Sequence, residues 1–266
     1  MNNIPKILHL YWGKNKPLSY LRYLTAYSFS KYNPDWKIKI YYPKHPGENP
    51  TWKNTSENKA KLDTECTFDI LKYISNVEMI EIDFDNNIND IFRADTIRLE
   101  KLSTVGGVWS DFDILYLKPI TDANLPDSNT YMSFNTDSNF KEQWYHSIGW
   151  LGACENNKVF KLLKDNVSNY YNPDDYQSIG SHMYNDIITE NQYYNIPFNM
   201  VYPVRWFDIN RYFKTKLNFY QQTIGVHWFG GADISTKIEH MIIKDKLDLY
   251  TFRNSMLLNN IQEILS

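Results

Sequence analysis

Cysteine is scarce in this chain of 266 residues, which contains only Cys66 and Cys154. Two cysteines form at most one bridge and neither lies in a CxxC pair, so a disulfide framework and a cysteine-rich metal site are both excluded. Long apolar runs are also missing: no stretch approaches the roughly 20 residues of a membrane helix, and the first residues lack the features of a signal peptide. We therefore expect reduced thiols and a soluble, cytoplasmic protein without a transmembrane segment, whose membrane contact is at most peripheral.

Charge of one sign is not in excess either. The chain carries 28 Lys and Arg against 31 Asp and Glu, a formal net charge of −3. Such a balance provides no strong positive field to hold nucleic acid, so a general DNA or RNA binder is excluded. Hydrophobic residues at 42% and aromatic residues at 16% are too many for a disordered chain. We expect a folded core and some aromatic rings that contact a ligand.

Strand and helix patterns alternate along the first half of the chain. The expected order is strand 4–12, helix 17–33, strand 36–42, a surface loop over 43–59 around Trp52, strand 78–82, helix 88–104 and strand 108–117. The second half is less regular, with strands at 147–154 and 225–229, helices at 158–169 and 180–189, and helical patterns after 236. This alternation predicts an α/β fold, a single domain over residues 1–266 with a mostly parallel, Rossmann-like sheet flanked by helices.

The helix predicted over 88–104 carries a carboxylate on its apolar stripe. Ile88, Phe92, Leu99 and Leu102 follow helical spacing, and Asp95 stands where the next apolar residue is expected. Arg98 lies three residues further on and is a neighbour on the same face. The two side chains form either a structural ion pair between helix and sheet or a donor and acceptor pair for a ligand.

Two further carboxylates follow the Gly106-Gly107 pair. In a regular strand Asp111 and Asp113 point to the same side, where their charges repel each other unless a cation compensates them. Mg²⁺ and Mn²⁺ prefer oxygen ligands and bridge diphosphate oxygens. The alternative is a solvated turn, and the apolar strand around the motif argues against it.

His227 is a candidate third ligand in the late strand 225–229. A histidine in an apolar strand is commonly a hydrogen-bonded core residue, but an imidazole also complements two carboxylates around a metal ion. Gly230 and Gly231 follow it and permit close approach of a phosphate to the backbone. We leave both interpretations of His227 open at this point.

Two other segments are candidate ligand contacts. Leu10, Tyr11 and Trp12 end the first strand at the edge where open α/β sheets bind ligands, and an indole there either stacks on a base or caps the core. The amides around Gly180, Ser181 and His182 begin a predicted helix and are able to receive an anion or a sugar hydroxyl. Ordinary capping by serine is the alternative.

Together these segments resemble the DXD-containing sugar transferases of glycosyltransferase family 32 and, more distantly, the glucosylating domains of large clostridial toxins. The resemblance rests on IPKILHLYWG at 4–13, RADTIR at 93–98 and GGVWSDFD at 106–113, in the same order and spacing. It implies a GT-A fold and a retaining hexosyltransferase that uses Mn²⁺ or Mg²⁺ and a nucleotide-sugar, most often a UDP-sugar. It also implies that residues 1–120 bind the donor and residues 121–266 select the sugar and the acceptor, a glycan, a lipid-linked glycan or a protein.

The resemblance also implies individual roles. Trp12 would stack near the base, and Asp95 and Arg98 would contact the donor sugar and its surroundings. Asp111 would reach the ribose and the ion, and Asp113 would bind the ion directly. Asp111, Asp113 and Arg98 would be the catalytic residues. His227 and Gly230 are similar to a His-x-x-Gly motif near the metal of related enzymes, although the lysine usual after that glycine is absent and Lys237 comes later.

Two other functions fit parts of the sequence. In a haloacid-dehalogenase-like phosphatase, Asp111 and Asp113 would be nucleophile and acid, and Asp174 and Asp175 would hold Mg²⁺. This leaves Trp12 and the Asp95 pair without roles. A non-catalytic sugar-binding module is favoured by the aromatic content alone.

Overall fold

A seven-stranded sheet forms the centre of the molecule, in the order β3-β2-β1-β4-β7-β6-β8. The computed structural model describes residues 1–14, 16–46, 67–84, 88–135, 145–242 and 254–266. The strands of this sheet are β1 (Ile7–Tyr11), β2 (Lys37–Pro43), β3 (Val77–Ile82), β4 (Gly107–Ser110), β6 (Thr130–Asn135), β7 (Tyr145–Ala153) and β8 (Tyr194–Asn195). The β1–β2, β2–β3, β1–β4 and β6–β8 pairs are parallel, whereas β7 runs antiparallel to β4 and β6. The expected α/β architecture with a mostly parallel sheet is confirmed.

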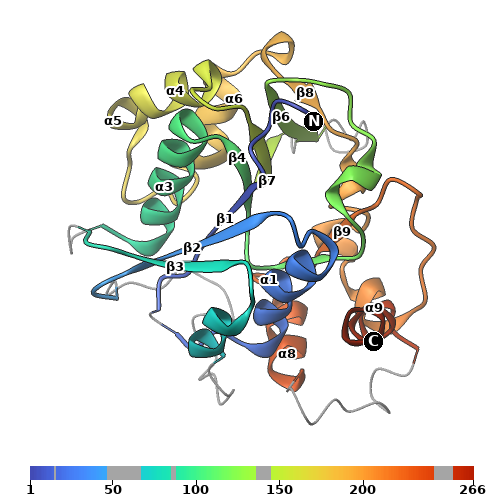
Figure 1. Cartoon of the computed structure of the whole chain (residues 1–266). Coiled ribbons are helices and arrows are strands. Elements are labelled where there is room, and N and C mark those ends of the chain that lie inside the picture. The colour runs from blue at the N-terminus through green and yellow to red at the C-terminus, as the bar shows by residue number, and fades with distance from the viewer. Residues whose placement is uncertain (15, 47–66, 85–87, 136–144, 243–253) are drawn as a thin grey trace.

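Helices cover both faces of this sheet (Figure 1). The helices of the described residues are α1 (Tyr20–Tyr32), α3 (Asp90–Thr104), α4 (Lys158–Asp165), α5 (Val167–Tyr170), α6 (Met183–Ile187), α7 (Asn210–Lys214), α8 (Asp233–Met241) and α9 (Met256–Leu265). The last three pack with α1 in a separate hydrophobic cluster. Alternation along β1 decides which core each side chain joins: Leu8 and Leu10 pack in one cluster with Phe29 of α1, while Tyr11 packs in another with Phe92 of α3. The sheet is therefore the middle of three layers.

Local signals set the ends of the two helices that border the site. The side chain of Ser19 accepts a hydrogen bond from the Arg22 N–H at 3.2 Å, so α1 begins three residues after the position that Pro17 predicts. After the C-terminal end of α3, Gly106 adopts a φ of +68°, and a Cβ there would lie 2.5 Å from the backbone of Cys154. Only glycine satisfies both conditions, so the chain turns directly from α3 into β4.

The single strand predicted over 108–117 is wrong. The chain forms β4, breaks at Asp111–Asp113 and resumes as β5 (Ile114–Tyr116) in a separate two-stranded sheet with β9 (Gly225–His227). The break occurs because β4 follows β7 only as far as Asp111, whose N–H donates to the Gly149 carbonyl at 2.8 Å, and β5 then changes partner. The two carboxylates lie in a connection between sheets, not on one face of a regular strand.

The second half differs from expectation in three places. The helix predicted over 158–169 is α4 and α5, divided at Asn166. The helix predicted over 180–189 is a wide turn at Ser178–His182 followed by α6, because Gly180 has non-helical angles of −96° and −130°. β6 and β8 were not predicted. Cys154 is a free, partly buried thiol as expected, whereas Trp52, Cys66 and Trp144 lie outside the described residues.

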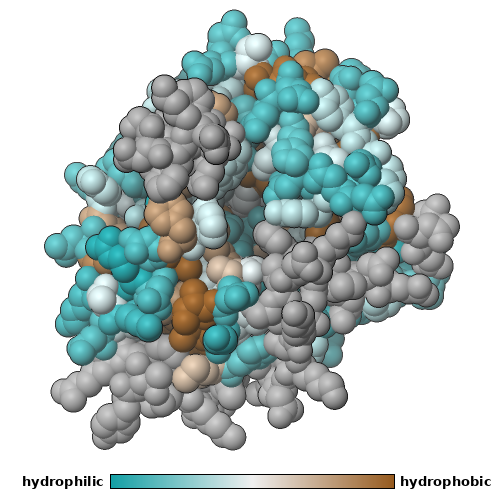
Figure 2. Space-filling model, turned by 180° about the vertical axis from the view of Figure 1, so that it is seen from behind, coloured by the Kyte–Doolittle hydropathy of each residue, from teal (hydrophilic) through white to brown (hydrophobic). Residues whose placement is uncertain are grey.

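No helix within the described residues is long and apolar enough for a membrane crossing. The view from behind shows a largely hydrophilic surface on which hydrophobic residues gather in small patches (Figure 2). The cytoplasmic location stays a prediction.

Candidate functional site

A cavity of about 250 Å³ lies at the carboxyl ends of β1 and β4. This is the edge at which open α/β sheets bind ligands, and its volume is near the lower end of small-molecule sites, about 300 Å³. The lining includes the end of β1, one face of α3 as far as Arg98, and the connection from β4 to β5. Residues 148, 176–177 and 231 complete it. Its charged members are Lys16, Arg22, Asp90, Asp95, Arg98, Asp111 and Asp113. The cavity therefore combines cations and carboxylates from segments far apart in the sequence.

Asp111 and Asp113 line this cavity and converge with His227, so that one ligand atom of each of the three residues lies within 4.8 Å of the others. The antiparallel pairing of β5 with β9 sets Ile114 opposite His227, so Asp113 reaches the imidazole. His227 Nε2 lies 3.1 Å from Asp113 Oδ1, and the Gly230 N–H donates to Asp113 Oδ2 at 2.7 Å. The structure thus brings together the three residues predicted as metal ligands.

The electrostatic environment separates the two carboxylates. Burial alone would raise the pKa of Asp113, but the charge and hydrogen bond of His227, the charge of Arg22 and the Gly230 N–H lower it to about 2. Burial raises the pKa of Asp111, with Arg98 opposing and Asp113 reinforcing the shift. His227 has a raised pKa because the attraction of Asp113 exceeds the effect of burial. Asp113 is therefore the more readily ionised of the two carboxyls, and a positive charge beside it favours ionisation of Asp111.

The donor set fits a divalent cation such as Mn²⁺ or Mg²⁺, because it offers carboxylate oxygens and one imidazole nitrogen. Asp113 Oδ1 is buried and has His227 Nε2 within 3.1 Å, but the angle of this contact does not satisfy a hydrogen bond, and no other described residue donates to this oxygen. Gly149 of β7 leaves the necessary space, since a Cβ there would lie 3.0 Å from His227 Nε2 and 3.1 Å from Asp111 Oδ2. Both observations favour an ion held between these side chains.

Asp95 and Arg98 form the ion pair that their spacing predicts. The Arg98 Nη1 donates to Asp95 Oδ1 at 2.7 Å, and its Nη2 lies 3.8 Å from Asp111 Oδ1. Trp109 lies beneath the guanidinium at 4.9 Å and donates from Nε1 to Asp111 at 3.0 Å. Burial raises the pKa of Asp95 to about 6, against the opposing charge of Arg98. The pair is both structural and exposed to the cavity, so the two interpretations of it are compatible.

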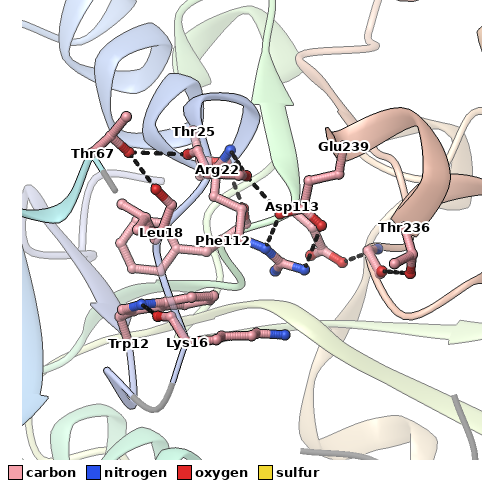
Figure 3. Close-up of polar contacts among 12 residues, drawn as sticks. Trp12, Lys16, Leu18, Arg22, Thr25, Thr67, Phe112, Asp113, Thr236 and Glu239 are labelled. Carbon is pink, nitrogen blue, oxygen red and sulfur yellow. Dashed lines mark hydrogen bonds and ion pairs between the residues drawn. The ribbon is translucent and has the colours of Figure 1, made fainter. Parts of the chain in front are cut away.

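Trp12 lines the cavity but is only 7% exposed. The Lys16 Nζ and the Arg22 Cζ lie 5.5 Å and 5.2 Å from the centre of its ring, and Phe112 packs against it edge to face (Figure 3). Its Nε1 donates to the Lys16 carbonyl at 3.2 Å. The indole is therefore a fixed wall of the site, and its contact with a base stays a prediction.

The remaining predicted contacts lie outside the cavity lining. Leu10 is fully buried in the core. Gly180 lies behind Gln177, and its Cβ would approach Ile148 at 3.1 Å. The Ser181 hydroxyl donates a hydrogen bond to the His146 carbonyl. The His182 side chain is 58% exposed and pairs with Asp175.

One physical reason accounts for the placement of Gly180, Ser181 and His182. The wide turn at Ser178–His182 replaces the open helix start, and the Ser181 N–H is taken by Gln177 Oε1 at 3.3 Å. The amides of Gly180 and Ser181 therefore do not form a helix start that faces the cavity. Any role of these residues, and of Gly230, in donor binding stays a prediction.

Sequence reasoning missed Arg22, Asp90 and Gly149. Asp90 accepts from the Tyr11 hydroxyl at 2.9 Å and lines the cavity beside Gly13. The position of Asp90 immediately after the Asn89 cap of α3 is a sequence signal for a place in the site, since residues in the first turn face the edge of the sheet. Nothing local marks Arg22 or Gly149, whose importance comes from partners distant in the sequence: Glu239 for Arg22, and Asp111 and His227 for Gly149.

One family model matches this chain over residues 53–219, that of the family described as capsular polysaccharide synthesis protein. This agrees with the polysaccharide setting that the motifs predict. No curated protein matches the chain.

Three solved structures are among those similar to this chain. The PaToxG glycosyltransferase is 16% identical with a TM-score of 0.44, covering 69% of this chain and 70% of its own. The apo form of glycosyltransferase GlyE from Streptococcus pneumoniae TIGR4 is 13% identical with a TM-score of 0.49, covering 85% of this chain and 54% of its own. The UDP-bound glycosyltransferase domain of the YGT toxin is 12% identical with a TM-score of 0.38, covering 92% and 80%. The chain thus spans about half the length of GlyE.

Proposed function

The chain belongs to the capsular polysaccharide synthesis protein family, and from this premise we propose that it is a metal-dependent glycosyltransferase of GT-A type that moves a sugar from a nucleotide-sugar to a hydroxyl acceptor. One observation carries the proposal: Asp111 and Asp113 line a cavity at the carboxyl edge of the sheet and converge with His227 within 4.8 Å. Neither the family nor the cavity alone would specify this chemistry.

The cation site supplies the first half of the proposed chemistry. A divalent cation held by Asp111, Asp113 and His227 would bind diphosphate oxygens and offset the negative charge that grows as the glycosidic bond breaks. Asp113 is suited to hold it because His227, Arg22 and the Gly230 N–H lower the pKa of its carboxyl and so favour the charged form. Gly149 keeps the space between the ligands open.

The other charged residues orient the donor. Arg98 is fixed by Asp95 and Trp109, so its guanidinium presents hydrogen-bond donors at a constant position beside Asp111. Asp95 accepts sugar hydroxyls on the same side, and Trp12 borders the base at the end of β1. Fixed groups of this kind need no rearrangement when charge develops, which is the condition for electrostatic stabilisation.

The finer assignments come from the motif resemblance. We propose a UDP-sugar donor, retention of the anomeric configuration, and an acceptor that is a glycan, a lipid-linked glycan or a protein. The division into a donor half, 1–120, and an acceptor half, 121–266, stays a prediction; Tyr176, Gln177 and Gly231 already bring the second half into the cavity wall.

The decisive experiment measures nucleotide release from a panel of UDP-sugars and GDP-sugars with Mn²⁺. We expect release of the nucleoside diphosphate from at least one donor, loss of release in EDTA, and loss in Asp113→Asn with an unchanged circular dichroism spectrum. Asp165→Asn is the matched control, because Asp165 is exposed and pairs only with Lys161 at 3.3 Å among the described residues. The anomeric configuration of the product, read by NMR, tests retention.

Inorganic phosphate release from phosphomonoesters in place of nucleotide release would favour the phosphatase. The described residues do not favour the phosphatase, because Asp175 pairs with His182 at 2.8 Å. Neither Asp174 nor Asp175 belongs to the cluster of potential metal ligands formed by Asp111, Asp113 and His227. Full turnover by Asp113→Asn would overturn the proposed cation site.

A further inference from the structure

Arg22 of α1 is held by a buried acid from the far end of the chain. Its Nε donates to Glu239 Oε1 of α8 at 2.6 Å, and its Nη2 lies 3.3 Å from Oε2. The Ser19 hydroxyl donates to the same Oε1 at 2.6 Å. Arg22 and Glu239 are 7% and 3% exposed. A buried ion pair is weak evidence for stability, because desolvation offsets much of the attraction, so its position at the cavity calls for another explanation.

Two indole rings fix the guanidinium. The Arg22 Cζ lies 5.2 Å from the centre of the Trp12 ring and 5.2 Å from that of Trp228. Both distances are within the range of cation–π attraction, about 6 Å. Figure 3 shows the guanidinium between Asp113 and Glu239, beside Trp12. With the fork to Glu239, these contacts define both the position and the plane of the guanidinium.

The residues that Arg22 touches are the ones that hold Asp113. The backbone N–H of Trp228 donates to the backbone carbonyl of Asp113 at 2.8 Å. The backbone N–H of Gly230 donates to the Asp113 side chain, at Oδ2, at 2.7 Å. Gly230 also packs directly on Arg22, because a Cβ at this position would lie 2.5 Å from Nη2. The charge of Arg22 contributes to the low pKa of Asp113. Displacement of the guanidinium would therefore move both backbone donors of Asp113.

We propose that Arg22, clamped by Glu239, is a positioning residue of the cation site, which acts by fixing Trp228 and Gly230 and through them Asp113. The inference rests on the proposed function, since it concerns the same site. It adds a residue outside the ligand set, from a helix that no motif links to the metal.

The sign of the expected effect separates positioning from charge. Arg22 is a positive group beside a site for a cation, so by Coulomb's law alone its removal would strengthen cation binding. If Arg22 positions Asp113, removal weakens binding, by about 10-fold to 100-fold as for other groups that orient metal ligands. A lysine at this position keeps the charge but loses the fork to Glu239.

The experiment measures Mn²⁺ binding to the purified full chain without nucleotide, from the EPR signal of the free ion. Arg22→Met and Arg22→Lys are compared with the wild type. Arg93→Lys is the matched control, because Arg93 is also a buried arginine paired with an acid, Asp90 at 3.3 Å, and stacked on a ring, Phe84 at 5.1 Å. We expect Mn²⁺ affinity to fall 10-fold to 100-fold in Arg22→Met, to fall less in Arg22→Lys, and to stay unchanged in Arg93→Lys.

Unchanged or tighter Mn²⁺ binding in Arg22→Met would overturn the proposal while leaving the cation site intact. If Arg22→Met does not fold, Arg22→Lys decides: an affinity equal to that of the wild type overturns the positioning role. A wild-type protein that binds no Mn²⁺ would overturn the proposed cation site and this inference with it.

Discussion

Replacement of Gly149 by alanine tests whether the space between Asp111 and His227 is used. The added Cβ would lie 3.0 Å from His227 Nε2 and 3.1 Å from Asp111 Oδ2. Non-bonded heavy atoms prefer separations of roughly 3.5 Å or more, so both side chains must move by about 0.4 Å. Metal sites tolerate deviations in ligand distance of about 0.2 Å. We therefore expect Gly149→Ala to weaken Mn²⁺ binding.

The expected loss is about 10-fold to 100-fold in affinity, or about 1.4 to 2.7 kcal/mol of binding free energy. Stability of the apo fold should change little, because alanine in a strand gains roughly 0.5 to 1 kcal/mol over glycine, which offsets part of the crowding. Cation binding and unfolding are thus expected to respond differently to one methyl group.

Isothermal titration with Mn²⁺ and thermal unfolding in EDTA measure the two quantities. Gly152→Ala is the matched control on the same strand, since the three atoms nearest to its Cβ would all belong to the Tyr131 side chain of β6, at 3.2 to 3.6 Å, and not to a proposed ligand of the ion. Equal Mn²⁺ affinity in Gly149→Ala and the wild type would refute the assignment of this space to an ion.

Two further predictions concern the sheet and its core. Burial lowers the pKa of His9 from 6.5 to about 4, although the Gly106 carbonyl opposes the shift. The unfolded chain binds this proton below pH 6.5 and the folded chain only near pH 4, so stability is lost as pH falls through this window, by up to about 3 kcal/mol. Urea unfolding between pH 7 and 4.5 should show a smaller loss in His9→Gln; an identical pH dependence in both proteins contradicts this. Phe29→Ala removes a fully buried ring 4.8 Å from that of Tyr116 and should cost about 3 to 5 kcal/mol in chemical unfolding, whereas a loss below 1 kcal/mol would show that this part of the core repacks freely.

The sequence predicted the parts of the fold that depend on local periodicity. β1, β2, β3, α1 and α3 occur where alternation, helical spacing and caps place them. The Asp95–Arg98 pair followed from helical spacing alone, because residues three apart on a helix are neighbours whatever surrounds them.

Features that depend on distant partners were not accessible in this way. The break between β4 and β5 occurs because β4 pairs with β7, whereas β5 pairs with β9, more than 100 residues further along the chain. His227 remained undecided for the same reason, since only the pairing of Ile114 with His227 brings it to Asp113. The sequence around Arg22 is that of an ordinary helix, and only the contact with Glu239, 217 residues away, distinguishes this arginine.

The two-stranded ribbon of β5 and β9 has a consequence for how the protein matures. Asp113 and His227 meet only when these strands pair, and α8 must then dock for Glu239 to reach Arg22. Contacts of such long sequence separation form late, after the loops that they close have been ordered. A refolding chain is therefore expected to acquire its capacity for Mn²⁺ after most of its helical signal has returned, so that ion uptake marks the last stage of assembly.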